Sequence, residues 1–193
     1  MRRLAQALGV EAMSLYHHVG GKREILGGIT DLVVRQIELP PADGDWKAAI
    51  RTCAVSAHQV LRRHPWAPNV LMSTDSIVPS RLVMVDALLA RLGDAHLLDE
   101  TLDLAYHALD SHILGFTLWE AGYAQGMRTM PPGGFEEVAK QLGLEAYPNL
   151  AQHAAWHFSG GHGRAKPAFE FGLDLLLDGI DAARGGVTEA PAT

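Results

Sequence analysis

The sequence predicts an all-α protein, and three observations support this prediction. Apolar residues recur at steps of three and four along nearly the whole chain, which is the spacing of one face of a helix. Alternating runs of β-branched residues bounded by hairpin turns are nearly absent, so we expect no sheet. Hydrophobic residues make up 48% of the 193 residues and charged residues 20%, a balance typical of globular proteins.

The first part of the chain predicts a head of three helices. Gly9 suits the left-handed position that ends a helix, and Gly20-Gly21 interrupts the next one. The proline- and glycine-rich segment 39–44 is the strongest break in the chain. The expected helices of the head cover 2–8, 12–18 and 22–37. We therefore predict a head domain over 1–38, a body domain over 43–186 and a flexible tail over 187–193.

The body is predicted to be helical throughout. Asp45 is a plausible N-cap for its first helix, and Pro167 suits the first position of its last helix. The helices expected in the body cover 46–64, 80–92, 99–124, 135–142, 148–158 and 167–184, and a short segment at 69–74 leads to Pro79.

The segment 4–19 predicts a helix-turn-helix. Ala5 is small enough for two helices to cross, Gly9 tolerates the turn, and Leu4, Leu8, Val10 and Leu15 supply apolar anchors. Such a unit places its second helix in the major groove of DNA. An ordinary helical hairpin with solvated aromatic residues is the alternative interpretation of the same pattern.

Charge is distributed unevenly along the chain. Residues 1–24 contain four basic and two acidic side chains and so have a net charge of +2. Because the whole chain has a net charge of −6, the remaining residues have a net charge of −8. A basic head on an acidic body is compatible with DNA binding through the head alone.

The letters LAQALGVEAMSLYHHV at 4–19, followed by GGKREIL at 20–26, closely resemble the DNA-reading segment of the tetracycline-repressor (TetR) family. Residues 102–109 and 115–116 resemble the long dimer-forming helix of the tetracycline-repressor subfamily, and residues 167–175 resemble its last helix. The resemblance covers most of the chain. It implies a transcriptional regulator, and more narrowly a repressor that a small-molecule effector releases from double-stranded operator DNA.

The resemblance also implies roles for residues of the head. Lys22 would grip a phosphate, and the second helix would turn Ala12, Met13 and Tyr16 toward the bases. A short alanine and an apolar methionine favour contact with thymine methyl groups over bidentate hydrogen bonding. The residues expected to hold the DNA backbone or reach a neighbouring base are Arg2, Ser14, His17 and His18.

The chain departs from the family pattern at its start. Family members carry a further helix before the point that corresponds to Met1, and this helix would cover Leu4, Leu8 and Leu15. Full burial of each such side chain is worth about 1.5–3 kcal/mol. We expect either that a further N-terminal piece precedes the given sequence or that the head is loosely folded, and we favour the first.

Two helices of the body are apolar on almost every side, which predicts burial in a homodimer through a four-helix bundle. A dimer would also place two heads at the spacing of a palindrome. Burial within one monomeric core is the alternative. The residues expected at the dimer interface are Leu102, Leu109, Ile113, Phe169, Gly172, Leu173, Leu176, Gly179 and Ile180.

A pocket for the effector is expected in the body, formed by apolar side chains with a few polar groups. Core packing is an equally good interpretation of each of these residues. By the family register, the tetracycline contacts fall on Cys53, Ala57 and Leu71, which cannot reproduce them, so tetracycline is not the expected effector. The candidate pocket residues are His58, His64, Trp66, Asn69, Met72, Met84, His107, His112, Phe116, Trp119 and Tyr123.

Other classes of function are less well supported. His153 and His157 have a spacing that can share one metal, but no HExxH pattern accompanies them, so we expect no metal and no cofactor. The segment 159–166 lacks the spacing of a phosphate-binding loop, and we do not expect an enzyme. Cys53, the single cysteine, fits a reducing cytoplasm, and no apolar run is long enough for a membrane span. A dimeric ligand-binding protein without DNA binding remains the chief alternative.

Overall fold

The computed structural model describes residues 1–73, 78–130, 134–158 and 166–184, with the side chain of Ala12 left undescribed. Within these residues the regular structure consists of helices alone, which confirms the predicted all-α fold class. The tail predicted over 187–193 lies outside the described residues, as does the glycine-rich part of the loop at 159–165. The predicted division into head and body domains stays a prediction.

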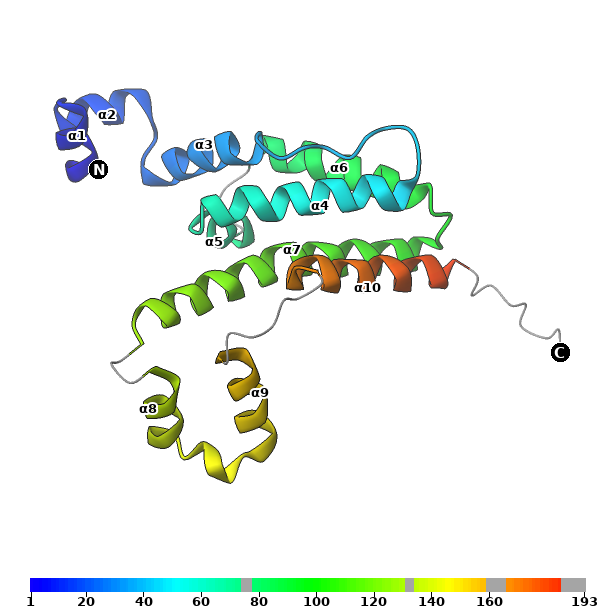
Figure 1. Cartoon of the computed structure of the whole chain (residues 1–193). Coiled ribbons are helices and arrows are strands. Elements are labelled where there is room, and N and C mark those ends of the chain that lie inside the picture. The colour runs from blue at the N-terminus through cyan, green and yellow to red at the C-terminus, as the bar shows by residue number, and fades with distance from the viewer. Residues whose placement is uncertain (74–77, 131–133, 159–165, 185–193) are drawn as a thin grey trace.

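The head stands at one end of the molecule (Figure 1). Its helices are α1 (Arg2–Leu8), α2 (Ala12–His18) and α3 (Lys22–Val34). α1 packs against α2, whereas α3 runs into the body and packs against it. α3 ends before residue 37 because Gln36 and Ile37 donate hydrogen bonds to carbonyls three residues back, which closes the chain into turns.

Four long helices form the body, with a short fifth beside them (Figure 1). They are α4 (Trp46–Arg63), α5 (Ala67–Met72), α6 (Pro79–Gly93), α7 (Asp99–Arg128) and α10 (Ala168–Ala183). The carboxylate of Asp45 accepts a hydrogen bond from the N–H of Ala48 at 2.8 Å, so Asp45 is the N-cap of α4 as predicted. The side chains that fill the core between these helices include Ile50, Cys53, Leu88, Leu92, Leu109, Ile113, Leu173 and Leu177.

The packing of α7 against α10 corrects the predicted dimer interface. Phe169, Leu173, Leu109, Ile113 and Ile180 are buried inside the single chain. A side chain with almost no exposed surface in one chain has none left to bury against a partner. Gly172 lies against the ring of His112, also inside the chain. Of the predicted set, Leu102 and Leu176 are half-buried and Gly179 is exposed.

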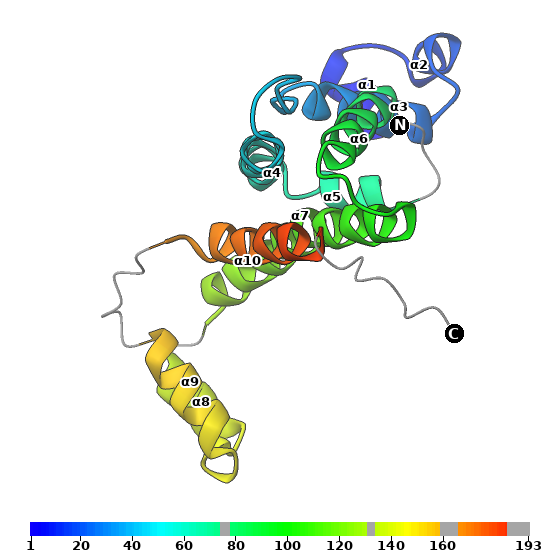
Figure 2. The same cartoon turned by 90° about the vertical axis from the view of Figure 1, so that its right-hand side faces the viewer.

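A helical hairpin follows α7 and leaves the body (Figures 1 and 2). It consists of α8 (Gly134–Gln141), the short 3-10 helix η1 (Leu144–Ala146) and α9 (Pro148–Phe158). Phe135 and Phe158 stack across the hairpin with ring centroids 4.5 Å apart. Leu144 is its one buried residue among those described, so the hairpin has little core of its own.

Polar contacts tie the connection between head and body to α6. The guanidinium of Arg91 donates hydrogen bonds to the carbonyls of Ala42 (2.8 Å) and Gly44 (2.7 Å). Arg91 also pairs with Asp94 at 2.6 Å. Because Arg91 is buried, these bonds fix the loop before α4 against the side of α6.

Candidate functional site

The turn between α1 and α2 has the geometry that the sequence predicts. Gly9 ends α1 with φ 67° and ψ 28°, in the left-handed region, and its N–H donates back to Gln6. The N–H of Val10 donates to the carbonyl of Ala5 at 3.0 Å, and Ala5 is buried where the two helices meet. The two helices are thus held at a fixed angle by local bonds.

The apolar anchors of this turn are less buried than the sequence suggests. Leu4 and Leu15 are half-buried, whereas Leu8 is 59% exposed and Val10 is 44% exposed. Ala5 is the one buried side chain of α1 and α2 among those described. The packing between α1 and α2 is therefore shallow.

The outer face of α2 offers several side chains to a partner. Met13 is 65% exposed and Tyr16 is 50% exposed, and His17 and His18 are exposed beside them. Ser14 is half-buried. The side chain of Ala12 lies outside the described residues, so its predicted base contact stays a prediction.

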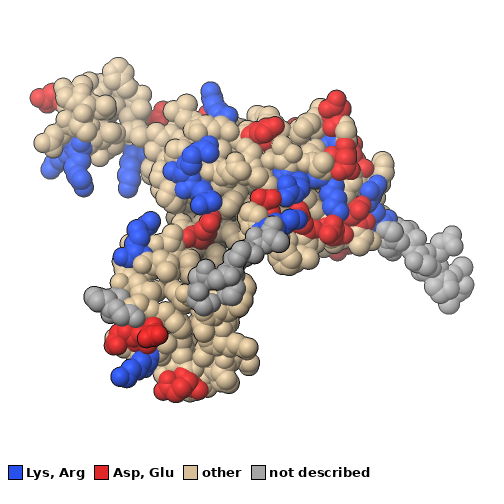
Figure 3. Space-filling model, in the orientation of Figure 1, with Lys and Arg blue, Asp and Glu red and all other residues tan. Residues whose placement is uncertain are grey.

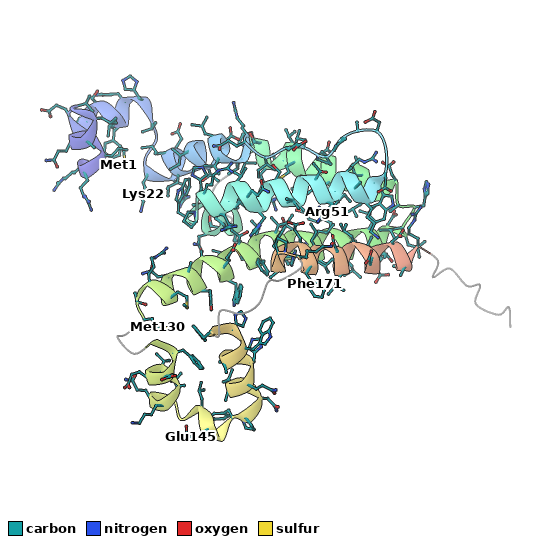
Figure 4. All side chains as sticks on the ribbon, in the orientation of Figure 1. Met1, Lys22, Arg51, Met130, Glu145 and Phe171 are labelled. Atoms are coloured by element: carbon teal, nitrogen blue, oxygen red, sulfur yellow. The ribbon has the colours of Figure 1, made fainter. Side chains whose placement is uncertain are left out.

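Lys22 lies at the first turn of α3, where its side chain is exposed (Figure 4). The N-terminus of a helix attracts anions through its unpaired N–H groups and its dipole. The carboxylate of Glu24 already accepts a hydrogen bond from the N–H of Gly20 just before this helix. An exposed lysine at this end matches the chemistry of a phosphate contact.

Positive charge gathers on one edge of the head (Figure 3). Arg2 and Arg3 are exposed on α1, and Lys22 and Arg23 are exposed at the start of α3. The opposite end of the molecule carries interleaved acidic and basic groups, where Lys47 and Arg51 of α4 pair with acidic residues of α10. The head thus presents four exposed basic side chains on one edge.

A pocket of about 370 Å³ opens between α4, α7, α9 and the start of α10. His58 and Phe169 stack at its base with ring centroids 3.9 Å apart and an interplanar angle of 7°. Phe116 meets Phe169 edge to face at 5.7 Å. Trp119 and Tyr123 stack on each other at 5.6 Å on another wall of the pocket. Flat aromatic surfaces thus line much of this cavity.

The polar groups of the pocket form a small hydrogen-bonded set. Nε2 of His58 donates to Oε2 of Glu120 at 2.9 Å, and Nε of Arg62 lies 3.4 Å from the same oxygen. Burial lowers the pKa of His58 below its ordinary 6.5, although the hydrogen bond to Glu120 acts in the opposite direction. His58 is therefore neutral near pH 7.

The structure brings together four of the predicted pocket residues, which are His58, Phe116, Trp119 and Tyr123. Nε2 of His112 donates to the carbonyl of Phe169 at 2.9 Å, so His112 supports the base of the pocket from outside its lining. The remaining predicted residues do not line it. Met84 is in the core, His64 packs on Trp66, His107 pairs with Asp103 on the surface, and Asn69 and Met72 are exposed.

Sequence reasoning missed Arg62, Glu120, His157 and Phe169, which all line the pocket. Phe169 had been expected at a dimer interface because α10 is apolar on several sides. Glu120 had a usable signal, since it is an acidic residue within an otherwise apolar stretch of α7. Arg62 and His157 carry no such signal, because charged and polar residues are ordinary near the ends of helices.

No metal centre is visible in the part of the chain that the structure describes. His153 and His157 have ring centroids 4.9 Å apart, but no group of three potential ligands forms among the described residues. Among the same residues, none of the helices combines the length and the apolar character that crossing a bilayer requires.

The chain is similar to known transcriptional regulators along most of its length. The profile of the tetracyclin repressor-like C-terminal domain matches residues 40–184. The HTH-type transcriptional repressor DrrR1 of Streptomyces coeruleorubidus is 30% identical over 190 residues, which cover 94% of this chain and 69% of that protein. An HTH-type transcriptional regulator of Saccharopolyspora erythraea is 26% identical over 186 residues, which cover 96% of this chain and 77% of that protein.

A solved structure extends the comparison to three dimensions. The TetR family protein ActR of Streptomyces coelicolor, in complex with actinorhodin, superposes with a TM-score of 0.69. It is 26% identical, and the match covers 96% of this chain and 88% of that chain. From the match of the family profile and of these relatives over nearly its whole length, the chain belongs to the TetR family of transcriptional regulators.

Proposed function

We propose that this chain is a transcriptional repressor that binds double-stranded operator DNA through its head and leaves it when a small molecule enters the pocket of the body. The observation that carries the proposal is the exposed outer face of α2 beside Lys22 at the start of α3. The naming of DrrR1 as a repressor and the presence of actinorhodin in the ActR structure support it. Its compartment would be the cytoplasm, together with its DNA.

In this proposal α2 enters the major groove. Tyr16 and Met13 would meet base edges and thymine methyl groups, together with Ala12. Arg2, Ser14, His17 and His18 would hold the backbone on either side, and Lys22 would bind one phosphate.

We also propose a homodimer, because a face of α7 and α10 stays apolar and open. Leu104 is exposed on α7, and Phe171 and Leu175 are exposed on α10. Phe171 lies on the side of α10 turned away from α4 (Figure 4). Leu102, Leu176 and Gly179 are accessible enough to join such an interface. A two-fold dimer through this face would carry two heads, as a palindromic operator requires.

α6 contacts both α7, which lines the pocket, and α3, which joins the head to the body. Arg81 of α6 pairs with Asp110 of α7, ten residues before Glu120. At the other side, the N–H of Ser80 donates to Asp31 of α3 at 2.8 Å. The Ser80 hydrogen bonds are the largest cause of the lowered pKa of Asp31, and Arg35 adds to them. We infer that a shift of α7 on ligand binding reaches α3 through these contacts.

The test begins by selecting a duplex for this protein from a random DNA pool. Binding is then measured by fluorescence anisotropy as a function of salt concentration. We expect Tyr16→Ala to weaken the selected duplex more than an unrelated one, because a base contact specifies sequence. We expect Lys22→Ala to weaken both duplexes and to reduce the salt slope by about one.

Matched substitutions outside the head provide the controls. Tyr147→Ala removes an exposed tyrosine after η1, and Lys140→Ala removes an exposed lysine of α8. Both should leave DNA affinity and salt slope unchanged. If no sequence is enriched from the pool at low salt, the chain is a ligand-binding protein without specific DNA binding and the proposal is wrong.

A further inference from the structure

The aromatic side chains that line the pocket indicate the shape of a ligand that would fit it. Trp119 and Tyr123 are stacked on each other, with Trp119 54% exposed, so their surfaces are open to a ligand. His58 and Phe169 stack on each other beneath this wall, but both are buried, so Trp119 and Tyr123 supply the aromatic surface that a ligand can reach. Stacked aromatic faces favour a flat ring system over a flexible chain, because a rigid planar ligand loses little conformational freedom on binding.

The polar side chains of the pocket indicate which hydrogen-bonding groups a ligand should carry. His58 and Arg62 both contact Oε2 of Glu120, whereas no hydrogen bond to Oε1 is found among the residues that the structure describes. The Glu120 side chain is 32% exposed, so it can accept a further hydrogen bond from a ligand hydroxyl. Arg62 is 59% exposed beside it and can donate to a neighbouring ligand oxygen.

We propose that this pocket binds a planar, fused-ring aromatic molecule that carries a phenolic hydroxyl group. The rings would stack against Trp119 and Tyr123, and the hydroxyl would donate to Glu120 while Arg62 donates to an adjacent oxygen of the ligand. This inference rests on the proposed function, since it names the effector class of that same site. Glu120 supplies the one carboxylate and Arg62 the one guanidinium among the described lining residues, which fits a ligand with a hydroxyl beside a second oxygen.

The charges of the lining argue against a cationic ligand. Glu120 is the only carboxylate among the described lining residues, and it is already shared by His58 and Arg62. A ligand cation would also approach the positive charge of Arg62. A neutral hydroxyl can share Glu120 without displacing either partner.

Neighbouring hollows allow the ligand to extend beyond a single ring. A cavity of about 240 Å³ shares Arg62 and Glu120 with the pocket, and one of about 340 Å³ shares Tyr123. All three cavities lie along α7 from Phe116 onward, and the third extends past the end of this helix to Met130. Several fused rings, or substituents on them, can therefore be accommodated along this helix.

The probes for the test are 2-hydroxyanthraquinone and 2-methylanthraquinone, which have the same rings and nearly the same size. Binding to the full chain is measured by equilibrium dialysis, read from the absorbance of each probe. We expect the hydroxyl compound to bind at least about tenfold more tightly, because only it can donate to Glu120. Equal binding of the two probes, or binding of neither, would overturn the proposal.

Substitutions of pocket residues test which contacts cause the preference for the hydroxyl probe. Glu120→Gln should reduce the preference for the hydroxyl probe toward equality, while Glu145→Gln at the tip of the hairpin should leave it unchanged (Figure 4). Trp119→Ala should weaken both probes to the same degree, because it removes stacking and not the hydrogen bond. Trp66→Ala, at a tryptophan that lies outside the pocket lining, should weaken neither. A preference that persists in Glu120→Gln contradicts the assigned contact.

The dialysis contains no DNA, so its result is independent of the proposed repressor activity. Loss of probe preference in a protein that still selects a duplex overturns the ligand class alone. Probe binding with the expected preference in a protein that selects no duplex overturns the repressor and leaves the pocket assignment in place.

Discussion

Gly172 lies in α10 at the point where this helix passes the ring of His112, and its replacement by alanine tests the packing beneath the pocket. A Cβ placed on Gly172 would lie 2.6 Å from Cε1 and 3.3 Å from Nε2 of His112. Carbon atoms pack at about 3.5–4.0 Å, so the imidazole must move by roughly 1 Å. This movement breaks the 2.9 Å hydrogen bond between His112 and the carbonyl of Phe169.

Three contributions determine the size of the effect. Overpacking costs about 1–3 kcal/mol, and the lost hydrogen bond costs about 0.5–1.5 kcal/mol. Alanine in place of glycine within a helix acts in the opposite direction by about 1 kcal/mol. We therefore expect Gly172→Ala to lower the free energy of unfolding by about 0.5–3.5 kcal/mol.

The assay is urea unfolding followed by circular dichroism, at one protein concentration because the stability of a dimer depends on it. The control is Gly122→Ala in α7, where the added Cβ meets nothing within 4 Å. This control should raise the free energy of unfolding by up to about 1 kcal/mol. If Gly172→Ala is as stable as the wild type while the control gains stability, the close approach of His112 does not exist and the reasoning is refuted.

Three further predictions follow from buried polar groups. Arg91→Met should lower the free energy of unfolding by about 2–4 kcal/mol in the same urea assay, because the carbonyls of Ala42 and Gly44 lose their hydrogen-bond donor. An unchanged free energy of unfolding would show that these hydrogen bonds do not stabilise the chain. The pKa of His58 is lower in the folded chain than its unfolded value of 6.5, so stability falls as the pH drops through 6.5 toward the folded pKa. His58→Gln should lose less stability than the wild type between about pH 7.5 and 5, and equal losses would count against this. Asp31→Asn should leave probe binding unchanged but raise the probe concentration needed for release from DNA, and unaltered release would exclude the route through α6.

The boundaries of several helices follow from the sequence because their signals are local, whereas α3 ends at Val34 before the predicted residue 37 and α7 continues to Arg128 beyond the predicted residue 124. Gly9 in the left-handed region and Asp45 as an N-cap both act within one turn of the chain. α9 has the predicted bounds, and the last helix begins one residue after Pro167, which is its N-cap rather than its first residue. The segment proposed to read DNA is equally local, because the residues of α1, α2 and the first turn of α3 are contiguous.

The sequence alone therefore determined the helical fold class and the chemistry of the head. Only the tertiary structure decided which faces of α7 and α10 form the core of one chain, because a helix that is apolar on every side has no periodic signal to distinguish them. It also decided the pocket, where Arg62 from α4, Glu120 from α7 and Phe169 from α10 meet. Contacts between residues so far apart in the chain depend on how the helices pack, and no local pattern records that packing.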